Sequence, residues 1–547
     1  MAVSVGKLSV KKRLTAIGNS EFWYEDIDVA AGEWVELTDA NGTIDTSEQI
    51  DCFEYDGKVF VLNGSTKKVA DFKNVKITTS NIGSHPPDFW NKLTGGSSDA
   101  VLYVDYITSL SGACTIYGQR TTSATFTNGE TVTGKDDDGN DISFTLSAAE
   151  DSGAVGGGEA HWYDFTVYGN SATYGTMPAT LVAGCAWNGR IVVTGNEDDP
   201  NQWYMFRQGM AWDLNYITGD TDPQTPVSGE DTDAGKCGEP IITPIPVNKD
   251  FLIMAGVNSL WYFPGDPGSH SPLLPLDTGS GILDAKAWCK DKFGNVYILS
   301  TTGMLKISSD LNSVENIFEK SYPNFIKDLA FDAATYRMIL GYDKLRNGIK
   351  IVKTKLSDGT NEMWWYDINE QALFPESVPE ECGIYCMFAY DALDSDYSGL
   401  LHGCKDGYVR VDDDDATDDD IGATDEAINS YVRFGPYKLG EEGKEGIINS
   451  VAVVAAGGES GGSLLTSDPI LLNVWTGRTA DSIVEKFDAG STPNIATTIS
   501  NSSIGRGNNI KKPVRGAFAG IHLGNSTASE VWGLDSLIVE GHSAGRI

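Results

Sequence analysis

The stretch NVYILST (295–301), followed by GMLKIS (303–308), has the pattern that decides the fold. A short apolar run rich in Val, Ile, Tyr and Leu ends at a Thr-Thr-Gly turn, and a second apolar run follows directly. Paired runs of this kind, closed by turn residues, predict two antiparallel β-strands joined by a hairpin.

The same pattern recurs along most of the chain. The first runs of the other pairs are KVFVLNG (58–64), RIVVTGN (190–196), DFLIMAG (250–256), YRMILGY (336–342) and GLLHGC (399–404). Their second runs are KKVADF (67–72), QWYMF (202–206), SLWYF (259–263), GIKIVKT (348–354) and GYVRVD (407–412). The starts at 250, 295 and 336 are spaced like four-stranded propeller blades, which take ~40–50 residues each. Helical periodicity is nearly absent, so we expect an all-β fold with a β-propeller of about six blades.

The interval between the first two of these pairs is too long for one blade. It contains hairpin signals of its own at Asn128-Gly129 and Asp138-Gly139. We therefore predict an N-terminal arm and the first blade strands at 1–75, a β-rich insertion at 76–181 and the remaining blades at 182–411. Two further, divergent blades in place of the insertion are the alternative.

The composition changes abruptly after the last pair. Residues 412–426, DDDDATDDDIGATDE, hold nine carboxylates and no cation. Such a block of like charges is expected to stay solvated and not to pack as a strand, which predicts an acidic linker at 412–427. Beyond it, alternating apolar runs predict a separate C-terminal β-sandwich at 428–547.

The charge balance restricts the partners. The 547 residues include 77 Asp plus Glu against 40 Lys plus Arg, a formal net charge of −37. This excess disfavours affinity for nucleic acids and for anionic membranes, because both need clustered cations. Eight scattered cysteines and an N-terminus without an apolar signal segment predict synthesis in a reducing cytoplasm.

Side chains that could carry chemistry are dispersed. The six histidines are far apart, the GxSxG matches at 458–462 and 541–545 form no strand-to-helix elbow, and the GxxxxGK[ST] and HExxH patterns are missing, so we expect no enzyme activity and no cofactor. Two Asp-rich segments have spacings that resemble calcium loops but lack the Glu at the twelfth position. Their candidate ligands are Asp136, Asp138, Asp391, Asp394 and Asp396, and the alternative is that these residues form hairpin turns. Trp364, Trp365, Tyr366, Trp203 and Tyr204 could stack on sugars, but packing inside the sheets is the favoured interpretation.

The order of several segments resembles one family of virion proteins. These segments are AWNGRIVVTGNEDDPNQWYMFRQGMAWDL (186–214), PIITPIPVNKDFLIMAGVNSLWYFPGDP (240–267), FGNVYILSTTGMLKIS (293–308), WWYD (364–367) and the C-terminal KKPVRGAFAGIHLGN and VWGLDSLIVEGHSAGRI. Together with a YD-x(n)-GIKIV segment at 342–352, the series is similar to the β-propeller nozzle, or distal tail-tube, proteins of short-tailed bacteriophages. The resemblance covers roughly 50–75 and 185–547 and leaves out the insertion.

This resemblance implies a structural protein of the phage tail. It implies a homohexameric ring stacked beneath an adaptor ring, with contacts to other tail proteins, to tail fibres and to the host surface. DNA would pass through the ring without specific binding, and the protein would be located in the virion tail after synthesis in the bacterial cytoplasm.

An acidic lining would repel passing DNA. The first candidates for such a surface are Asp412, Asp413, Asp414, Asp415, Asp418, Asp419 and Asp420. The basic residues Lys7, Lys11, Lys12 and Arg13 either dock on an acidic neighbour or form a solvated arm. The alternatives to the tail role are a glycan-binding or depolymerising β-propeller that acts on host surface polysaccharide, and an intracellular scaffold propeller.

Overall fold

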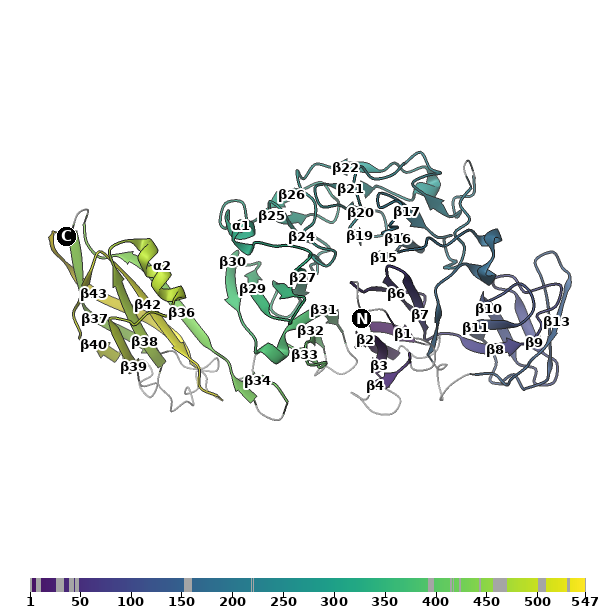
Figure 1. Cartoon of the computed structure of the whole chain (residues 1–547), viewed down its shortest axis with the longest axis horizontal. Helices are drawn as coiled ribbons and strands as arrows, with labels where there is room; N and C mark the ends of the chain where they lie inside the picture. The colour runs from purple at the N-terminus through teal and green to yellow at the C-terminus, as the bar shows by residue number, and fades with distance from the viewer. Residues whose placement is uncertain are drawn as a thin grey trace. The chain divides into compact units, whose positions relative to one another are not determined.

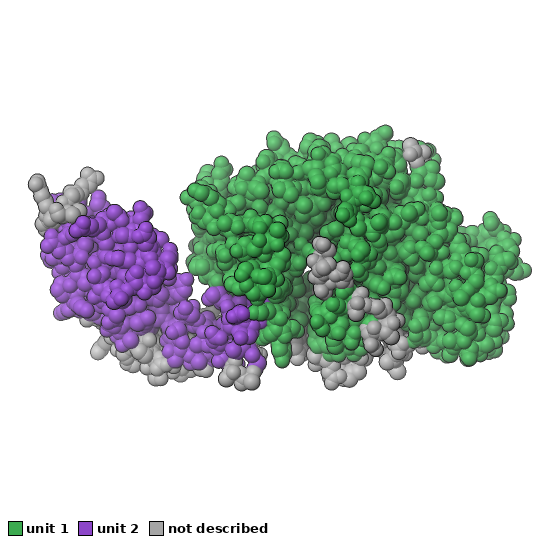
Figure 2. All heavy atoms as spheres, viewed as in Figure 1, with its two compact units in different colours: residues 1–376, 384–412 green, residues 377–383, 413–547 purple. Residues whose placement is uncertain are grey.

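A computed structural model shows that the chain forms two compact units, residues 1–376 with 384–412, and residues 377–383 with 413–547 (Figure 2). The residues that the structure describes are 2–5, 11–25, 34–38, 44, 49–151, 160–217, 219, 221–391, 398–413, 416, 418–422, 425–441, 444–455, 470–499, 508–528 and 532–546. Within them, no helix has the length and the apolar character that crossing a membrane requires.

The first unit is a β-propeller, in which small antiparallel sheets follow one another around a ring (Figure 1). Blade 1 contains β1 (Ala2–Val5), β2 (Lys11–Gly18), β3 (Glu21–Glu25) and β4 (Trp34–Glu36), and blade 2 contains β5 (Asp51–Tyr55), β6 (Lys58–Asn63), β7 (Thr66–Asp71) and β14 (His161–Asp164). Blade 3 contains β15 (Ala183–Trp187), β16 (Arg190–Thr194), β17 (Trp203–Met205) and β18 (Val227–Ser228), and blade 4 contains β19 (Thr243–Pro246), β20 (Leu252–Ala255), β21 (Leu260–Phe263) and β22 (Leu274–Leu276).

The remaining blades complete the ring. Blade 5 contains β23 (Trp288–Lys290), β24 (Val296–Ser300), β25 (Gly303–Ile307) and β26 (Val314–Asn316), and blade 6 contains β27 (Tyr336–Asp343), β28 (Gly348–Lys355), β29 (Asn361–Asp367) and β30 (Ala372–Glu376). Blade 7 has three strands in the described residues, β31 (Ile384–Tyr390), β32 (Gly399–Cys404) and β33 (Val409–Val411). The one-turn helix α1 (Phe325–Leu329) lies between blades 5 and 6.

The strand pairs predicted from the sequence lie in six different blades, 2 to 7, which confirms the all-β propeller class. Their regularity has a physical cause. Every residue of β6, β16, β20 and β24 is buried, because the second strand of a blade is covered on both faces by the neighbouring blades. A strand buried on both faces is a continuous apolar run in the sequence.

Blade 1 corrects the prediction of an N-terminal arm. Its strands close the ring, since Leu14 packs with Tyr390 and Leu401 of blade 7, and Phe22 packs with Val59 of blade 2. Of the basic residues, Lys11, Lys12 and Arg13 belong to β2 and not to a solvated arm: Arg13 is buried, and Lys12 Nζ donates a hydrogen bond to the carbonyl oxygen of Asp391 at 2.7 Å. Lys7 lies outside the described residues. Three consecutive cations at the start of β2 hide its strand pattern.

The insertion is a six-stranded antiparallel sheet that projects from the side of blade 2 (Figure 1). Its strands, in sheet order, are β13 (Asp141–Thr145), β12 (Thr131–Lys135), β9 (Lys92–Gly95), β10 (Val101–Ile107), β11 (Cys114–Arg120) and β8 (Val75–Thr79). The range predicted for the insertion, 76–181, also contains β14, which pairs with β7 as a strand of blade 2. The chain therefore leaves blade 2 after β7 and returns to it at β14.

A buried polar network fastens the insertion to the propeller. Lys58 of β6, only 1% exposed, places Nζ 2.7 Å from Oδ2 of Asp105 in β10. The same carboxylate accepts hydrogen bonds from Asn74 Nδ2 at 2.6 Å and from Trp212 Nε1 at 3.2 Å. Asn74 also donates to Asp71, which accepts a further bond from Tyr163 Oη at 2.8 Å. Because each buried charge has partners, this network can hold the two sheets in one arrangement.

An ion pair links two blades that are not neighbours in the ring. Lys286, which precedes β23 of blade 5, bonds through Nζ to Oδ1 of Asp51 in β5 of blade 2. Asp51 Oδ2 accepts a hydrogen bond from the amide of Gly184 in β15 at 2.9 Å. Although burial acts against the charged form, the carboxylate of Asp51 raises the pKa of Lys286. Asp51 thus ties blade 2 both to blade 3 and to blade 5.

The second unit is a β-sandwich with a short hairpin before it. One sheet contains β36 (Ser430–Lys438), β42 (Phe518–Asn525), β38 (Ile470–Gly477) and β39 (Ile495–Ile499), and the other contains β40 (Asn508–Ile510), β37 (Lys444–Ala455), β41 (Val514–Gly516) and β43 (Leu534–Arg546). The apolar side chains between the sheets include Ile448, Val453, Leu472 and Leu523. The helix α2 (Ala480–Asp488) begins at a capping box and packs Ile483 and Phe487 against Trp475.

The acidic segment contains a hairpin, contrary to the prediction that it could not form strands. β34 (Asp418–Asp420) pairs with β35 (Asp425–Ala427) in antiparallel register. The ladder uses backbone groups alone, and the side chains of Asp425 and Glu426 are exposed to solvent, so the like charges do not prevent pairing.

Candidate functional site: an exposed aromatic face on the insertion

Asp412 does not belong to an open acidic surface. Its Oδ2 lies 2.6 Å from Lys350 Nζ and 3.7 Å from Arg346, and its Oδ1 lies 3.7 Å from His402 Nδ1. Glu376 also contacts Lys350, at 3.4 Å. These residues come from blades 6 and 7, and Asp412 directly follows β33, so the group is an ion network that joins two neighbouring blades.

The network shifts two ionisation equilibria. Burial, reinforced by the charge of Lys350, lowers the pKa of His402 to about 4, so this imidazole is neutral at pH 7. Burial opposes ionisation of Asp412, but His402, Lys350 and Arg346 together lower the pKa of its carboxyl. Nε2 of His402 is buried without a hydrogen-bond partner.

The other predicted acidic residues lie in different surroundings. Asp413 is exposed, Asp418 and Asp419 are half-buried in β34, and Asp420 ends that strand. Asp414 and Asp415 lie outside the described residues.

The predicted calcium ligands do not form a cage in the described part of the chain. Asp136 holds the turn before β13, accepting hydrogen bonds from the Asn140 amide at 2.7 Å and from Asn140 Nδ2 at 2.9 Å. Asp138 is exposed at the tip of that turn, and Asp391 lies 3.7 Å from Lys344 Nζ. Asp394 and Asp396 lie outside the described residues. Among those described, three or more His, Cys, Asp or Glu side chains nowhere gather in a metal-binding arrangement.

The aromatic residues considered for sugar stacking are mostly core. Trp203, Tyr204, Trp365 and Tyr366 are all buried, and Trp364 packs edge-on against Phe325 with ring centroids 5.2 Å apart. This agrees with the interpretation that they pack between sheets.

A different aromatic pair is exposed, on the insertion. Trp90 is 50% exposed, and its ring centroid lies 5.6 Å from that of Tyr103 in β10, with 34° between the planes. Both rings border a shallow, open hollow of about 550 Å³ on this face. Its lining also includes Lys92, Thr94, Thr133, Lys135 and Asp141.

The strand register explains why these residues share one face. Tyr103 lies opposite Lys92, Thr133 lies opposite Thr94, and Lys135 lies opposite Asp141. The alternate residues Leu93, Leu102, Val132 and Ile142 point into the core of the insertion. One face of the sheet is therefore buried, and the other presents aromatic, hydroxyl and charged side chains to solvent.

The backbone of Trp90 is held in an unusual conformation. Its φ is +69°, in the left-handed region that a bulky residue rarely adopts. The amide of Trp90 donates to Val104 O at 2.7 Å, and the carbonyl oxygen of Asn91 accepts from the amide of Val104 at 3.0 Å. These two bonds fix the loop against β10, with the indole directed away from the core.

The Asp-rich turn supports this loop. Asn91 Nδ2 donates to Asp137 Oδ1 at 2.8 Å, and the amide of Asp137 donates to Asp88 Oδ2 at 3.2 Å. Burial raises the pKa of Asp88, and the hydrogen bond from Asp137 acts in the opposite direction. Sequence reasoning missed the aromatic pair. The available signals were a Trp in the polar segment PPDFWNK (86–92) and a Tyr within the run VLYVDYI (101–107).

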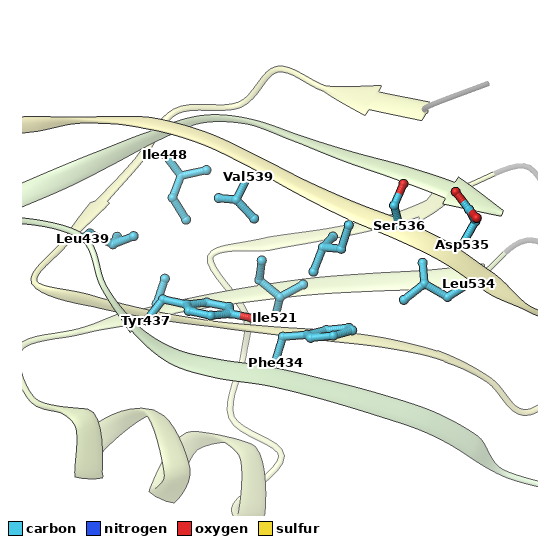
Figure 3. A pocket seen from close by; sticks show the side chains of 11 residues that line it. Phe434, Tyr437, Leu439, Ile448, Ile521, Leu534, Asp535, Ser536 and Val539 are labelled. Carbon is cyan, nitrogen blue, oxygen red and sulfur yellow. The ribbon is translucent and has the colours of Figure 1, made fainter. Parts of the chain in front are cut away.

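The sandwich contains a second hollow, of about 420 Å³, between its sheets (Figure 3). It is lined mainly by apolar side chains, among them Phe434, Ile448, Ile521, Leu534 and Val539, with Asp535 and Ser536 on its border. These side chains continue the core of the sandwich, and the arrangement offers no pair of groups suited to acid–base or nucleophilic chemistry.

Comparison with known proteins gives a distant likeness to propeller structures. No family model and no curated protein matches the chain. Among solved structures, the tricorn protease is 10% identical, with 73% of this chain and 43% of that chain covered and a TM-score of 0.24. A quinoprotein alcohol dehydrogenase-like protein from Bacteroides thetaiotaomicron is 11% identical, with 66% and 74% covered and a TM-score of 0.25. The extracellular domain of a one-component system from the same organism is 9% identical, with 91% and 82% covered and a TM-score of 0.31.

Proposed function

We propose that this protein is a non-catalytic structural component of a short-tailed bacteriophage tail, part of the nozzle or tail tube that surrounds the path of ejected DNA. The observation that supports the proposal is the position of the family-like segments in the fold. Residues 186–214 span β15 to β17, residues 240–267 span β19 to β21, and residues 293–308 span β24 and β25. The C-terminal segments contain β42 and β43 of the sandwich. The resemblance thus follows consecutive blades and the closing strands, and it omits the inserted sheet.

In this proposal the DNA path lies between subunits of a ring. Lys286 and Asp51 tie together two blades that are not neighbours in the propeller, so each propeller would act as one rigid building block of the ring. A homohexamer would surround a channel, dock on an adaptor ring and offer its loops to other tail proteins and fibres. The protein would be made in the bacterial cytoplasm and reside in the virion tail.

The charge of the chain is compatible with this role. A net charge of −37 keeps a polyanion from adhering, and repetition around a ring would strengthen the repulsion within about one Debye length, ~10 Å at 0.1 M salt. We assign the repulsion of passing DNA to the exposed carboxylates of the acidic segment, such as Asp413, Asp425 and Glu426. Asp412 is left out of this set, because its charge is neutralised by Lys350.

The test is to locate the chain in virions. Antibodies against the purified protein are applied to virions of the phage that encodes it, and gold labelling is viewed by electron microscopy. We expect labelling confined to the tail, together with ring-shaped particles in the purified protein or in isolated tails. Virions that carry no label after mild opening of the tail, or that lack the chain by mass spectrometry, would overturn the proposal.

A further inference from the structure

We infer that the exposed face of the inserted sheet is a binding site for a neutral polysaccharide, with Trp90 and Tyr103 as its stacking platform. This inference goes beyond the tail role and does not rest on it, because it depends only on the geometry of the insertion. The face lies on the side of the sheet opposite the buried core, and the insertion projects from the ring of blades (Figure 1).

The first argument is the aromatic pair. The indole and the phenol ring are in contact, with centroids 5.6 Å apart and planes inclined by 34°, and they form one apolar patch in an otherwise polar face. Rings of this kind bind the C–H faces of sugars, while the hydroxyl groups of the sugar remain available to polar neighbours. The other tryptophans of the first unit are buried or half-buried, so the exposure of Trp90 is not a general property of this surface.

The second argument is the set of polar groups around the rings. Thr94 and Thr133 supply hydroxyls, and Lys92 supplies an ammonium group next to Tyr103 across the strands. Lys135 and Asp141 form an exposed ion pair at 2.6 Å, which presents a donor and an acceptor beside each other. A polyhydroxylated ligand can use both kinds of group at once.

The third argument is preorganisation. The backbone of Trp90 is held at φ +69° by its bonds to Val104, and Asn91 is fixed by Asp88 and Asp137. A positive φ is uncommon for a bulky residue, and strained backbone conformations cluster at functional sites. A rigid platform loses little conformational entropy on binding, which raises affinity for a weakly held ligand.

Charge decides between a sugar and a nucleic acid, which could also stack on these rings. The turn beside the platform carries Asp136, Asp137 and Asp138, and Asp88 supports the loop. Lys92 and Lys135 of the lining are outnumbered by Asp141 and these four carboxylates, so the surroundings of the rings are net negative and repel a phosphodiester chain. Binders of single strands combine aromatic platforms with a positively charged groove instead. We therefore assign an uncharged chain of hexoses as the ligand class.

The experiment is affinity electrophoresis of the full-length protein in native gels that contain dextran, yeast mannan or galactan. We expect at least one of these neutral polysaccharides to retard the wild-type protein, and Trp90→Ala and Tyr103→Ala each to weaken the binding at least tenfold. Phe293→Ala is the matched control, because Phe293 is 72% exposed in the propeller and far in sequence from this face. It should bind like wild type.

Several outcomes would overturn the inference. They are no retardation by any of the three polysaccharides, equal binding by the Trp90→Ala protein, and binding of a single-stranded DNA probe in place of the sugars. Trp90→Gly separates binding from folding, since glycine adopts the same backbone conformation without strain. It should lose binding while its thermal midpoint is no lower than that of Trp90→Ala. The readout uses the isolated chain, so it is independent of whether virions contain the protein.

Discussion

Lys58 of blade 2 and Asp105 of the insertion form a buried ion pair, in which Nζ lies 2.7 Å from Oδ2. The pair joins two separate sheets whose residues are far apart in the sequence. The carboxylate is also bonded by Asn74 and Trp212, so neither charge is left without a partner. Burial disfavours both charged forms, but Asp105 and its acidic neighbours raise the pKa of Lys58, and Lys58 lowers the pKa of Asp105. The pair remains ionised and holds the insertion to the propeller.

Removing one partner of this pair should destabilise the protein strongly. Lys58→Met or Asp105→Leu leaves an uncompensated buried charge, which costs ~3–5 kcal/mol. The double variant should lose much less than the sum of the two, because no lone charge remains. Urea unfolding followed by fluorescence measures the three free energies. Asp164→Asn is the control: Asp164 pairs with Lys68 but is 76% exposed, and such a pair is worth ~0–1 kcal/mol. Strict additivity of the single effects would contradict the pairing.

The ion network between blades 6 and 7 predicts a loss of stability in weak acid. The folded-state pKa of His402 is lowered to about 4, below the value of ~6.5 in the unfolded chain. Above pH 6.5 the imidazole of His402 is neutral in both the folded and the unfolded chain, so it does not make the free energy of unfolding depend on pH. Between 6.5 and 4 the unfolded chain binds the proton first, so stability falls as the pH falls, by up to about 3 kcal/mol. Asp412, whose pKa is lowered, adds a further loss at still lower pH.

Replacing the imidazole should flatten this dependence. In the His402→Gln protein, the free energy of unfolding is expected to fall less steeply between pH 6.5 and 4 than in the wild type, whatever its value at pH 7. The measurement is the urea midpoint at half-unit pH intervals. The control is the exposed His270, replaced by Asn because its φ of +63° suits that residue; this change removes an imidazole that lies outside the network. A His402→Gln protein with an unchanged slope would show that other groups cause the acid sensitivity.

The strain at Trp90 predicts a reversal of the usual order of alanine and glycine. Both Trp90→Ala and Trp90→Gly remove the indole, so they differ mainly in backbone energy. At φ +69° alanine remains strained by roughly 1 kcal/mol and glycine does not, so the glycine variant should be the more stable. At Lys92, in the extended strand β9, the order should be normal, with glycine less stable by ~0.5–1 kcal/mol. Thermal or urea unfolding of the four variants decides the question.

The sequence predicts the parts of this fold that depend on residues close together in the chain. The second strands of blades 2 to 5 are buried on both faces, and their continuous apolar runs made the propeller recognisable. Blade 6 was identified by its first strand, β27, and not by its second strand, β28. Blade 1 was missed because Lys11, Lys12 and Arg13 mask the apolar pattern of its second strand. That strand is buried by contacts with blade 7, which lies at the other end of the propeller sequence.

The candidate sites depend on long-range contacts and were harder to predict. Asp412 stands in an acidic run, yet its partner Lys350 lies in another blade, so the run as a whole suggested a solvated surface. Trp90 and Tyr103 meet only because the loop before β9 folds back on β10, and the positive φ of Trp90 has no signal in its residue type.

Arg190 provides a test of how blades 3 and 4 are joined. Its fully buried guanidinium bonds to Asp266 through Nε at 2.8 Å and to the carbonyl oxygens of Phe206, Pro223 and Thr225 at 2.6–3.0 Å. Lysine carries the same charge, but its single ammonium cannot satisfy acceptors that lie in several directions. Arg190→Lys should therefore behave as a disruptive change and lower the free energy of unfolding by roughly 3 kcal/mol or more.

The matched control is Arg207→Lys in the same blade region. Arg207 is 32% exposed and pairs with Asp213 and Asp222, both at 2.8 Å, so water can replace lost hydrogen bonds. Its replacement should cost less than about 1 kcal/mol. Guanidinium chloride unfolding of both variants, with limited proteolysis to detect local opening between blades 3 and 4, gives the comparison. If the two substitutions proved equally mild, the Arg190 cluster would not be what joins these blades, and the apolar contacts of Trp187 and Trp203 with Phe263 would have to account for the junction.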